Sequence, residues 1–493
     1  LRGVGASDDA TVLTAPRGVD AIRVRAPDGM EPSPEVSVTL SRLKVRGDAS
    51  ATPGEQGAGV RVEGPRSTLT LRDVVVERMD VGVRVHEGAT LCARDVSLRR
   101  SRRAGLAVLN GMALVTGGLI RDGDNLGVLA DRSVLAMRSS LVAGNAREGV
   151  VVRGARSNGT RCTPPGDGGT PSDGCASLSL CGESMVVHEC ASSLAIPPGP
   201  DEPGMAAVSE CRGVSTLEEV AVIGNGVVGV RAERVPPPTD AGTHERNEVF
   251  AQPGARLRAT RALIGGTRAV PGEPGGDGLY VGSTATVTLD PNIVSEDAGV
   301  PGSVVTNNAR AGVLVDGDRG ATVPNPLRAW GSLAASGTTV RYNRGPGMYI
   351  QERAVATRLA YGVIHDNTAL GLGVTAGGSV PRIQCEHFTG TREGTIVTDR
   401  GSLTLADGLS MSEDTAGTTL EQSEFSGNAR YGMIIIGIPV SLVGANTARA
   451  NVRGVGLFTD NVSGSRGGLM NPASGLPPAE VARGAVDIST SSR

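Results

Sequence analysis

The chain has 493 residues, of which 71 are glycine and 2% are aromatic. This composition excludes a large core built around aromatic rings and favours a narrow interior filled by Val, Leu, Ile and Ala. The formal net charge of −3 gives the whole chain no bulk electrostatic preference for nucleic acid or an anionic membrane. No apolar run approaches the roughly 18 residues that a membrane-spanning helix needs.

The first 58 residues contain one or two imperfect copies of a short repeat, in which Val36–Val45 is the clearest strand pattern. The sequence starts without Met or a signal-peptide pattern, and it starts in what reads as the middle of a repeat. We therefore expect residues upstream of position 1.

A regular repeat occupies residues 59–152. A Gly-Val or Gly-Leu pair recurs at 22- or 23-residue intervals, starting at Gly59, Gly82, Gly105, Gly127 and Gly149. The intervening residues alternate between apolar and polar with period two, which is typical of short strands and not of helices. Such a short unit cannot bury an apolar face alone, whereas stacked coils share one continuous core. The sequence predicts an all-β fold, a right-handed parallel β-helix solenoid of about 14 coils.

The coils continue to about residue 470 and are interrupted by loops rich in Pro, Gly and Cys. We expect insertions at about 153–203, 233–248, 316–332 and 410–417, and a tail or linker at 471–493. Coils resume near Gly204 and at Gly229. Further coil starts are predicted at Gly278, Gly312, Gly347, Gly371, Gly394, Gly432 and Gly456.

An asparagine precedes many of these glycines by four residues. The six cases are Asn145, Asn225, Asn308, Asn343, Asn367 and Asn428. Asn tolerates the left-handed turn conformation and bonds to local backbone, so amides in successive coils are expected to form a ladder. The pattern, as in Asn428-Ala-Arg-Tyr-Gly432-Met-Ile-Ile, resembles the parallel β-helix repeats of the pectin-lyase-like superfamily. That resemblance implies a fold; the family includes polysaccharide lyases, hydrolases, epimerases, tailspikes and adhesins, so no single activity follows.

In enzymes of that superfamily the substrate lies across the first strand of each coil. The third residue of each Gly-[Val/Leu/Met]-x-[Val/Ile] strand points outward, and this outward row contains no Asp, Glu or His. Its second half is apolar or aromatic, which predicts a binding surface or a surface covered by the insertions. The predicted surface residues are Arg231, Tyr280, Leu314, Tyr349, Ile434 and Phe458.

Acidic residues recur just beyond these strands, and a lyase, hydrolase or epimerase needs an acid, a base or carboxylates that hold a metal. The candidate catalytic residues are Asp316, Glu352, Asp399, His365 and Asp366. Glu63 and His86 share the same position of the coil as the acidic row. No cluster of outward aspartates predicts a metal site, and calcium is the one cofactor that remains open.

Five of the seven cysteines lie between residues 162 and 211, namely Cys162, Cys175, Cys181, Cys190 and Cys211. Disulfides are favoured over zinc because the segment has no Cys-x-x-Cys. Pairs Cys162–Cys175 and Cys181–Cys190 would close short loops, although pairing cannot be derived from sequence. Cys92 is expected to face outward. Disulfides imply an oxidising location, extracellular, periplasmic or at the cell surface.

Together these observations favour a secreted or cell-surface β-helix that is not an enzyme and acts as a scaffold or adhesin-like binding rod. Its expected partners are a polysaccharide or another surface protein. The basic run at 99–103 lacks interleaved aromatic residues, so nucleic acid is not an expected partner. The alternative is a polysaccharide-active enzyme of the lyase, hydrolase or epimerase type, with its site beside the first strands.

Overall fold

The computed structural model describes residues 11–470 except 27–34, 162–177, 193–208, 235–253, 291–301, 318–330, 412–417 and gaps of one to four residues, and also Val486–Ile488. The described residues form strands and turns and contain no helix. They divide into two compact units. Unit 1 comprises 1–225, 232–258 and 321–329, and unit 2 comprises 226–231, 259–320 and 330–493.

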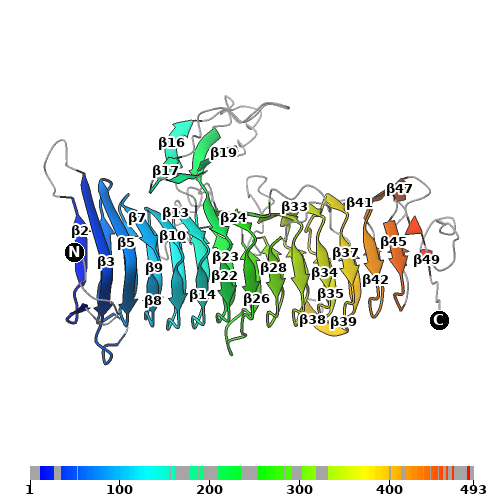
Figure 1. The fold of residues 1–493 in the computed structure, drawn as a ribbon. Helices are drawn as coiled ribbons and strands as arrows, with labels where there is room; N and C mark the ends of the chain where they lie inside the picture. Colours follow the sequence, from blue (N-terminus) through cyan, green and yellow to red (C-terminus); the bar gives the residue numbers. More distant parts are fainter. Residues whose placement is uncertain are drawn as a thin grey trace, which may run out of the picture. The chain divides into compact units, whose positions relative to one another are not determined.

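Each coil has three strands, which we call the first, second and third strand. In unit 1 the first strands pair in parallel from one coil to the next, and Figure 1 shows several of them as successive arrows. They are β2 (Ile22–Arg25), β4 (Ala58–Glu63), β6 (Val81–His86), β9 (Ala104–Leu109), β12 (Leu126–Asp131) and β15 (Val150–Arg153).

The second and third strands of unit 1 form parallel ladders of their own. The second strands are β7 (Thr90–Arg94), β10 (Met112–Thr116), β13 (Val134–Arg138) and β21 (Ser215–Glu218). The third strands are β8 (Ser97–Arg99), β11 (Leu119–Arg121), β14 (Leu141–Ala143), β22 (Ala221–Ile223) and, at the N-terminal end, β1 (Val12–Thr14). In β3 (Val36–Arg46) and β5 (Ser67–Glu77) the second and third strands are continuous.

Unit 2 repeats this arrangement. Its first strands are β26 (Asp277–Val281), β29 (Val313–Asp316), β32 (Met348–Gln351), β35 (Leu370–Val374), β40 (Asp407–Met411), β43 (Met433–Ile436) and β46 (Val455–Phe458). Its second strands are β27 (Thr286–Leu289), β30 (Ser332–Ser336), β33 (Val355–Ala360), β36 (Arg382–Gln384), β41 (Thr418–Glu421), β44 (Val440–Val443) and β47 (Val462–Gly464). Its third strands are β25 (Leu263–Gly265), β28 (Val304–Thr306), β31 (Thr339–Arg341), β34 (Val363–His365), β37 (His387–Thr389), β42 (Glu424–Ser426), β45 (Asn446–Arg449) and β48 (Leu469–Met470).

The predicted parallel β-helix solenoid is confirmed. Six first strands lie in unit 1, seven lie in unit 2, and β23 (Val228–Glu233) has residues in both, which agrees with the expected 14 coils. Their inward side chains stack in columns. Val60, Val83, Leu106, Val128 and Val150 pair in register and are at most 1% exposed.

The corners of the coil need residues in the left-handed region. A single residue of positive φ joins the second to the third strand in many coils, for example Asp95 at 52° and Gly117 at 66°. Gly, Asn and Asp occupy this region at low cost, and other residue types pay a backbone penalty. This protein places Tyr361, Arg261 and Cys385 at the same corner, at φ values of 50–59°. A sequence rule based on Gly and Asn alone therefore misses several corners.

The expected asparagine ladder is present in both units. Asn145 donates its amide to Asn225 in unit 1 over 2.9 Å. In unit 2 the amide of Asn308 donates to Asn343, and that of Asn343 to Asn367, both over 2.8 Å. Asn428 bonds in the same way to Asn451, which the sequence pattern had not included because no glycine lies four residues after it.

Two predicted coil starts are wrong. The strand at Gly394 is not a first strand, because β38 (Gly394–Thr398) pairs antiparallel with β39 (Gly401–Leu405) as a hairpin. The first strand of that coil is β40, which pairs with β35 and β43. In the last full coil Ile434 pairs with Gly456 and not with Phe458. The first strand of that coil, β46, therefore begins at Val455, and Gly456 occupies the outward position that the sequence assigned to Phe458.

The first insertion has its own strands. β16 (Ser157–Arg161), β19 (His188–Ser192) and β20 (Ser209–Gly213) form an antiparallel sheet, and β17 (Leu178–Leu180) pairs with β18 (Glu183–Met185). The regular coil resumes only at β21, beyond the expected end at 203 and the coil start expected near Gly204.

Cys181 forms a disulfide with Cys92, with the two Cα atoms 5.7 Å apart, so the expected Cys181–Cys190 pair is wrong. Cys92 lies on the outward side of β7, as predicted, and the insertion folds back to reach it. Cys162 and Cys175 lie outside the described residues.

Candidate binding surface

The predicted surface residues of unit 2 stand in one row on the first strands. Tyr280 pairs with Leu314, Leu314 with Tyr349, and Tyr349 with Gly373. Ser410 and Ile434 follow in the next two coils. The register therefore brings these side chains onto one face. Phe458 lies two positions further along its strand, and the placement of its side chain is not described.

Tyr280 marks one end of the aromatic part of this row. The guanidinium carbon of Arg231 lies 5.2 Å from the centre of its ring, which is a cation–π contact. Leu314 is only 6% exposed between the two tyrosines, so the predicted surface is less aliphatic than the sequence suggested.

Tyr349 lies over the neighbouring coil. A side chain at Gly373 would place its Cβ 2.7 Å from Tyr349 Cδ2 and 2.9 Å from Cε2, so the ring covers the space that the glycine leaves. The Tyr349 hydroxyl accepts a hydrogen bond of 3.0 Å from Thr375 Oγ1. Both contacts hold the ring against the strand ladder, while the residue stays half-buried. The sequence carries no signal for this arrangement beyond the lone glycine in the row.

The candidate catalytic residues do not come together. Asp316 lies at the C-terminal end of β29, where Gln351 donates to it over 3.3 Å, and Glu352 follows β32 in a turn with φ of 53°. His365 and Asp366 form a pair at 2.8 Å, but they lie at the end of β34, which precedes the N-terminal end of the next first strand. The two groups therefore flank opposite ends of the first strands. Asp399 lies outside the described residues.

His365 and Asp366 have other contacts. The ring of Tyr342 packs edge-on against His365 with 5.4 Å between ring centres, and Arg392 Nη2 lies 3.7 Å from Asp366 Oδ1. Tyr342 is 43% exposed. This group forms a polar corner on the third strands.

A histidine–carboxylate pair does occur on the first strands of unit 1. Glu63 pairs in register with His86, and Glu63 Oε2 lies 2.8 Å from His86 Nε2. Arg61 Nε donates to His86 Nε2 over 2.8 Å, and Arg23 Nε donates to Glu63 Oε1 over 2.6 Å. Burial alone would raise the pKa of Glu63, but the hydrogen bond from Arg23 and the charges of Arg61, Arg23 and His86 lower it. The carboxylate is thus held ionised in a site only 1% exposed.

The same cluster offers the geometry of a metal site without its electrostatics. Glu63, His86 and Glu87 place one possible ligand atom each within 4.8 Å of one another. Arg23 and Arg61 hydrogen-bond or ion-pair with Glu63, and Arg25 lies 3.6 Å from it. A cation would have to displace these guanidinium groups, so the residues present do not fit calcium or zinc.

Comparisons with known proteins assign no family to this chain. No family model and no curated protein matches the sequence. The mannuronan C-5 epimerase AlgE4 A-module of Azotobacter vinelandii is similar at 14% identity, with 87% of this chain and 91% of that chain covered and a TM-score of 0.39. A double mutant of the periplasmic alginate epimerase AlgG follows at 12% identity, 87% and 70% coverage and a TM-score of 0.34. Tailspike protein 3 of bacteriophage CBA120 has 8% identity, 97% and 56% coverage and a TM-score of 0.31.

At these identities and TM-scores the similarities assign neither a family nor an activity to this chain. In the part of the chain that the structure describes, no helix is long and apolar enough to cross a membrane.

Proposed function

We propose that this chain is a secreted or cell-surface β-helix that binds an extended polysaccharide without transforming it. The binding surface is the row from Arg231 through Tyr280 and Leu314 to Tyr349. The observation that carries the proposal is the placement of Tyr349 on Gly373, which fixes an aromatic ring along the strand ladder.

A polysaccharide fits this row for geometric reasons. Tyr280 and Tyr349 stand two coils apart, which is roughly 10 Å at the usual strand spacing. Rings fixed at a regular interval along a line suit a linear chain of sugars, whose apolar ring faces stack on aromatic side chains. A ring that is already fixed loses little conformational entropy when the ligand binds. The Cys92–Cys181 disulfide supports an oxidising, extracytoplasmic location.

The test is binding to a panel of soluble polysaccharides by affinity electrophoresis or calorimetry. We expect Tyr349→Ala to weaken binding by about tenfold, because a stacked aromatic ring contributes on the order of 1 kcal/mol or more. Tyr280→Ala should act in the same direction. Tyr342→Ala is the matched control, since Tyr342 is exposed in the turn that follows the third strand β31 and its replacement should leave binding unchanged. Equal affinity of wild type and Tyr349→Ala for every bound polymer would refute the proposal.

A polysaccharide-active enzyme is the second candidate, and the Glu63–His86 pair is the observation that favours it. A histidine beside an ionised carboxylate and an arginine is a set of groups that acid–base chemistry can use. Both ring nitrogens already have protein neighbours, since Nδ1 lies 3.4 Å from Glu87 and Nε2 contacts Glu63 and Arg61. This arrangement suits an ion-pair network better than a group that waits for substrate.

The enzyme candidate is tested by incubating the protein with alginate and polygalacturonate, with and without calcium. Unsaturated or shorter products, or altered uronate composition, that vanish in His86→Gln would establish catalysis there. A His86→Gln variant that folds and binds polymer as wild type, with no product from either protein, supports the binding role.

A further inference from the structure

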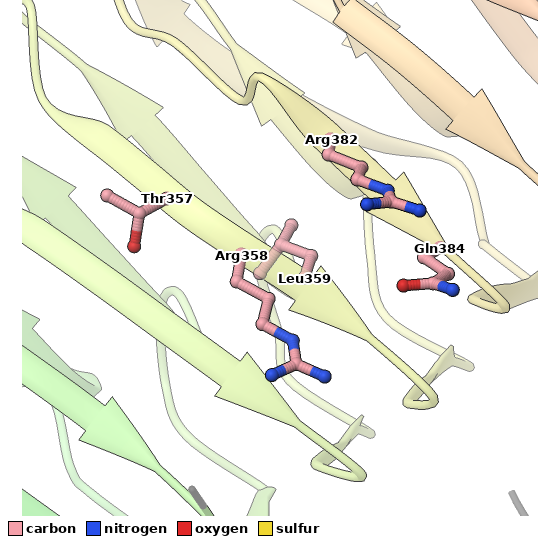
Figure 2. Close-up of a pocket in the computed structure, with 5 residues that line it drawn as sticks. All are labelled: Thr357, Arg358, Leu359, Arg382 and Gln384. Carbon is pink, nitrogen blue, oxygen red and sulfur yellow. The ribbon is translucent and has the colours of Figure 1, made fainter. Parts of the chain in front are cut away.

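A cavity of about 340 Å³ lies on the second strands of unit 2, away from the first-strand row. It is lined by Thr357, Arg358, Leu359, Arg382 and Gln384. Figure 2 shows the arginine and glutamine side chains projecting from the neighbouring strands β33 and β36. No role in the proposed polysaccharide row accounts for it.

A β-bulge borders this site. Leu333 pairs with Ala356, but the next residue, Ala334, pairs with Arg358, so Thr357 is an extra residue in β33. The Thr357 hydroxyl donates to the Leu333 carbonyl over 3.1 Å, which satisfies an acceptor at the disrupted ladder. Bulges bend a strand and redirect side chains, and they are frequent beside functional sites.

Two arginines lie at adjacent positions of β33 and β36. Because Leu359 pairs with Ile383, the residue before each, Arg358 and Arg382, also face one another across adjacent coils. Like charges at directly paired positions destabilise a sheet. Arg382 is neutralised by Glu421, whose Oε2 accepts from Arg382 Nε over 3.0 Å. Arg358 is half-buried and has no acidic partner among the described residues.

We infer that this cavity binds an oxyanion, a carboxylate or a sulfate group, between Arg358 and Arg382. The donors that line it are two guanidinium groups and the Gln384 amide, and no carboxylate is among the lining residues. Guanidinium groups bind such anions through paired charge-assisted hydrogen bonds. The ligand would contact Arg382 beside Glu421, whose carboxylate already neutralises that arginine. The positive charge that attracts the anion therefore comes from Arg358. This inference does not depend on the proposed function, because the two surfaces lie on different strand ladders.

Two probes test the site on the full chain. Thermal unfolding is followed in sodium sulfate and in sodium chloride at equal ionic strength, and trigalacturonate binding is measured by calorimetry. Sulfate stabilises folded proteins in general, so we expect it to raise the melting temperature, relative to chloride, more in the wild type than in Arg358→Gln. Trigalacturonate is expected to bind the wild type. Arg358→Gln should weaken binding by about tenfold, because it removes charged hydrogen bonds. Stronger binding of sulfate assigns a sulfate ester, and stronger binding of trigalacturonate assigns a uronate.

Matched variants separate this site from the tyrosine row. Arg344→Gln replaces an exposed arginine that does not line the cavity, and this variant should bind both probes as wild type does. Tyr349→Ala should keep sulfate binding even if polysaccharide binding falls. The inference is overturned if neither probe binds the wild type, or if Arg358→Gln and Arg382→Gln bind as tightly as Arg344→Gln.

Discussion

At the scale of single residues, the asparagines show what a repeat pattern can reveal. Four of the buried ladder asparagines bond to the next coil twice: Asn308, for example, donates both its backbone N–H and its side-chain amide to Asn343 Oδ1. The sequence predicted this ladder because the same residue type recurs at the same position of the coil. No other residue offers both a donor and an acceptor of that shape, so the identity is fixed by chemistry.

Asn343 occupies the middle of the unit 2 ladder and gives the sharpest test of its strength. Asn343→Ala leaves the donors of Asn308 and the acceptor of Asn367 without their partner in a fully buried site. We expect the free energy of unfolding to fall by about 2–4 kcal/mol. The measurement is urea unfolding followed by circular dichroism.

The neighbouring Asn307 provides the control for that experiment. It is exposed and sits in the left-handed region at 57°, so Asn307→Gly keeps the backbone conformation and removes no buried bond. A change of less than about 0.5 kcal/mol is expected for such a surface site. Equal losses in the two variants would contradict a ladder-specific contribution.

Glu386 is a residue whose environment the sequence did not indicate. It is 4% exposed, and its Oε1 accepts from the Gly362 backbone N–H over 3.2 Å. A Cβ at position 362 would lie 2.9 Å from both carboxylate oxygens, so the glycine makes room for it. Burial raises the pKa of Glu386 to about 8, and the single backbone bond offsets this only in part. The carboxyl is therefore protonated in the folded protein at neutral pH.

This burial predicts a specific pH dependence of stability. Between the ordinary value of 4.5 and about 8, the folded state holds a proton that the unfolded chain has lost. Stability is therefore greatest below pH 4.5 for this group and falls as pH rises to 8, by up to about 1.4 kcal/mol per pH unit. Glu386→Gln keeps the acceptor for Gly362 and cannot titrate, so it should flatten this part of the profile. Urea unfolding at pH 6 and 8 measures the difference.

The exposed Glu393 serves as the matched replacement in that comparison. Glu393→Gln should retain the fall in stability between pH 6 and 8. A wild-type profile that is flat over this range, or one that Glu386→Gln leaves unchanged, would show that the carboxyl is hydrated and ionised.

At the scale of elements, the sequence predicted the positions of most coils correctly. It misplaced the first strand of a coil where two segments of the sequence both fitted the repeat pattern. Gly394 and Gly408 both start an apolar strand, but only β40 pairs with the first strands of the adjacent coils. The strand at Gly394 closes a hairpin with its own neighbour because only two residues separate β38 from β39. Whether two neighbouring strands pair as a hairpin depends on the turn between them, and the spacing of the repeats carries no information about that turn.

The pairing of the cysteines could not be predicted from the sequence for a related reason. Cys92 and Cys181 are 89 residues apart in the chain, and only the return of the insertion to β7 brings them together. The outward row beside Cys92 is covered as well, since Leu114 and Ala136 are at most 3% exposed although they point away from the core. The disulfide thus ties the part of the insertion around Cys181 to the second-strand side of the coil, whereas the sequence suggested insertions that cover the first-strand row.

The strand register predicts one more disulfide. Cys190 and Cys211 are direct partners in the antiparallel pair of β19 and β20, which brings their Cα atoms to about 4.5–5.5 Å, within the range of a disulfide. With Cys92–Cys181 formed and Cys385 a buried thiol that donates to Gln422 Oε1 over 3.6 Å, we expect Cys162 and Cys175 to form a third pair. Non-reducing peptide mapping should recover the three pairs and one thiol. A peptide linking Cys190 to Cys162 or Cys175 would contradict the register.

At the scale of the whole chain, stability is distributed because each coil contacts its neighbours and little else. Such solenoids behave as a sum of coil stabilities and interfaces, so damage stays local before it spreads. In unit 2, one contact between successive coils is made by two large, buried aromatic side chains. Phe388 and Phe425 stack in successive coils with ring centres 5.1 Å apart and an angle of 3°, and both are fully buried.

Phe388→Ala should reveal this distribution. Removing a buried aromatic ring costs about 3–5 kcal/mol, which is large for one coil. We expect hydrogen exchange to accelerate first in β34, β37 and β42, which pair with one another around Phe388. The strands β9 and β12 of unit 1 share no strand pairing with this coil and should keep their protection. Uniform loss of protection in all strands would mean that the chain unfolds as one cooperative body, and the nearest-neighbour description would fail.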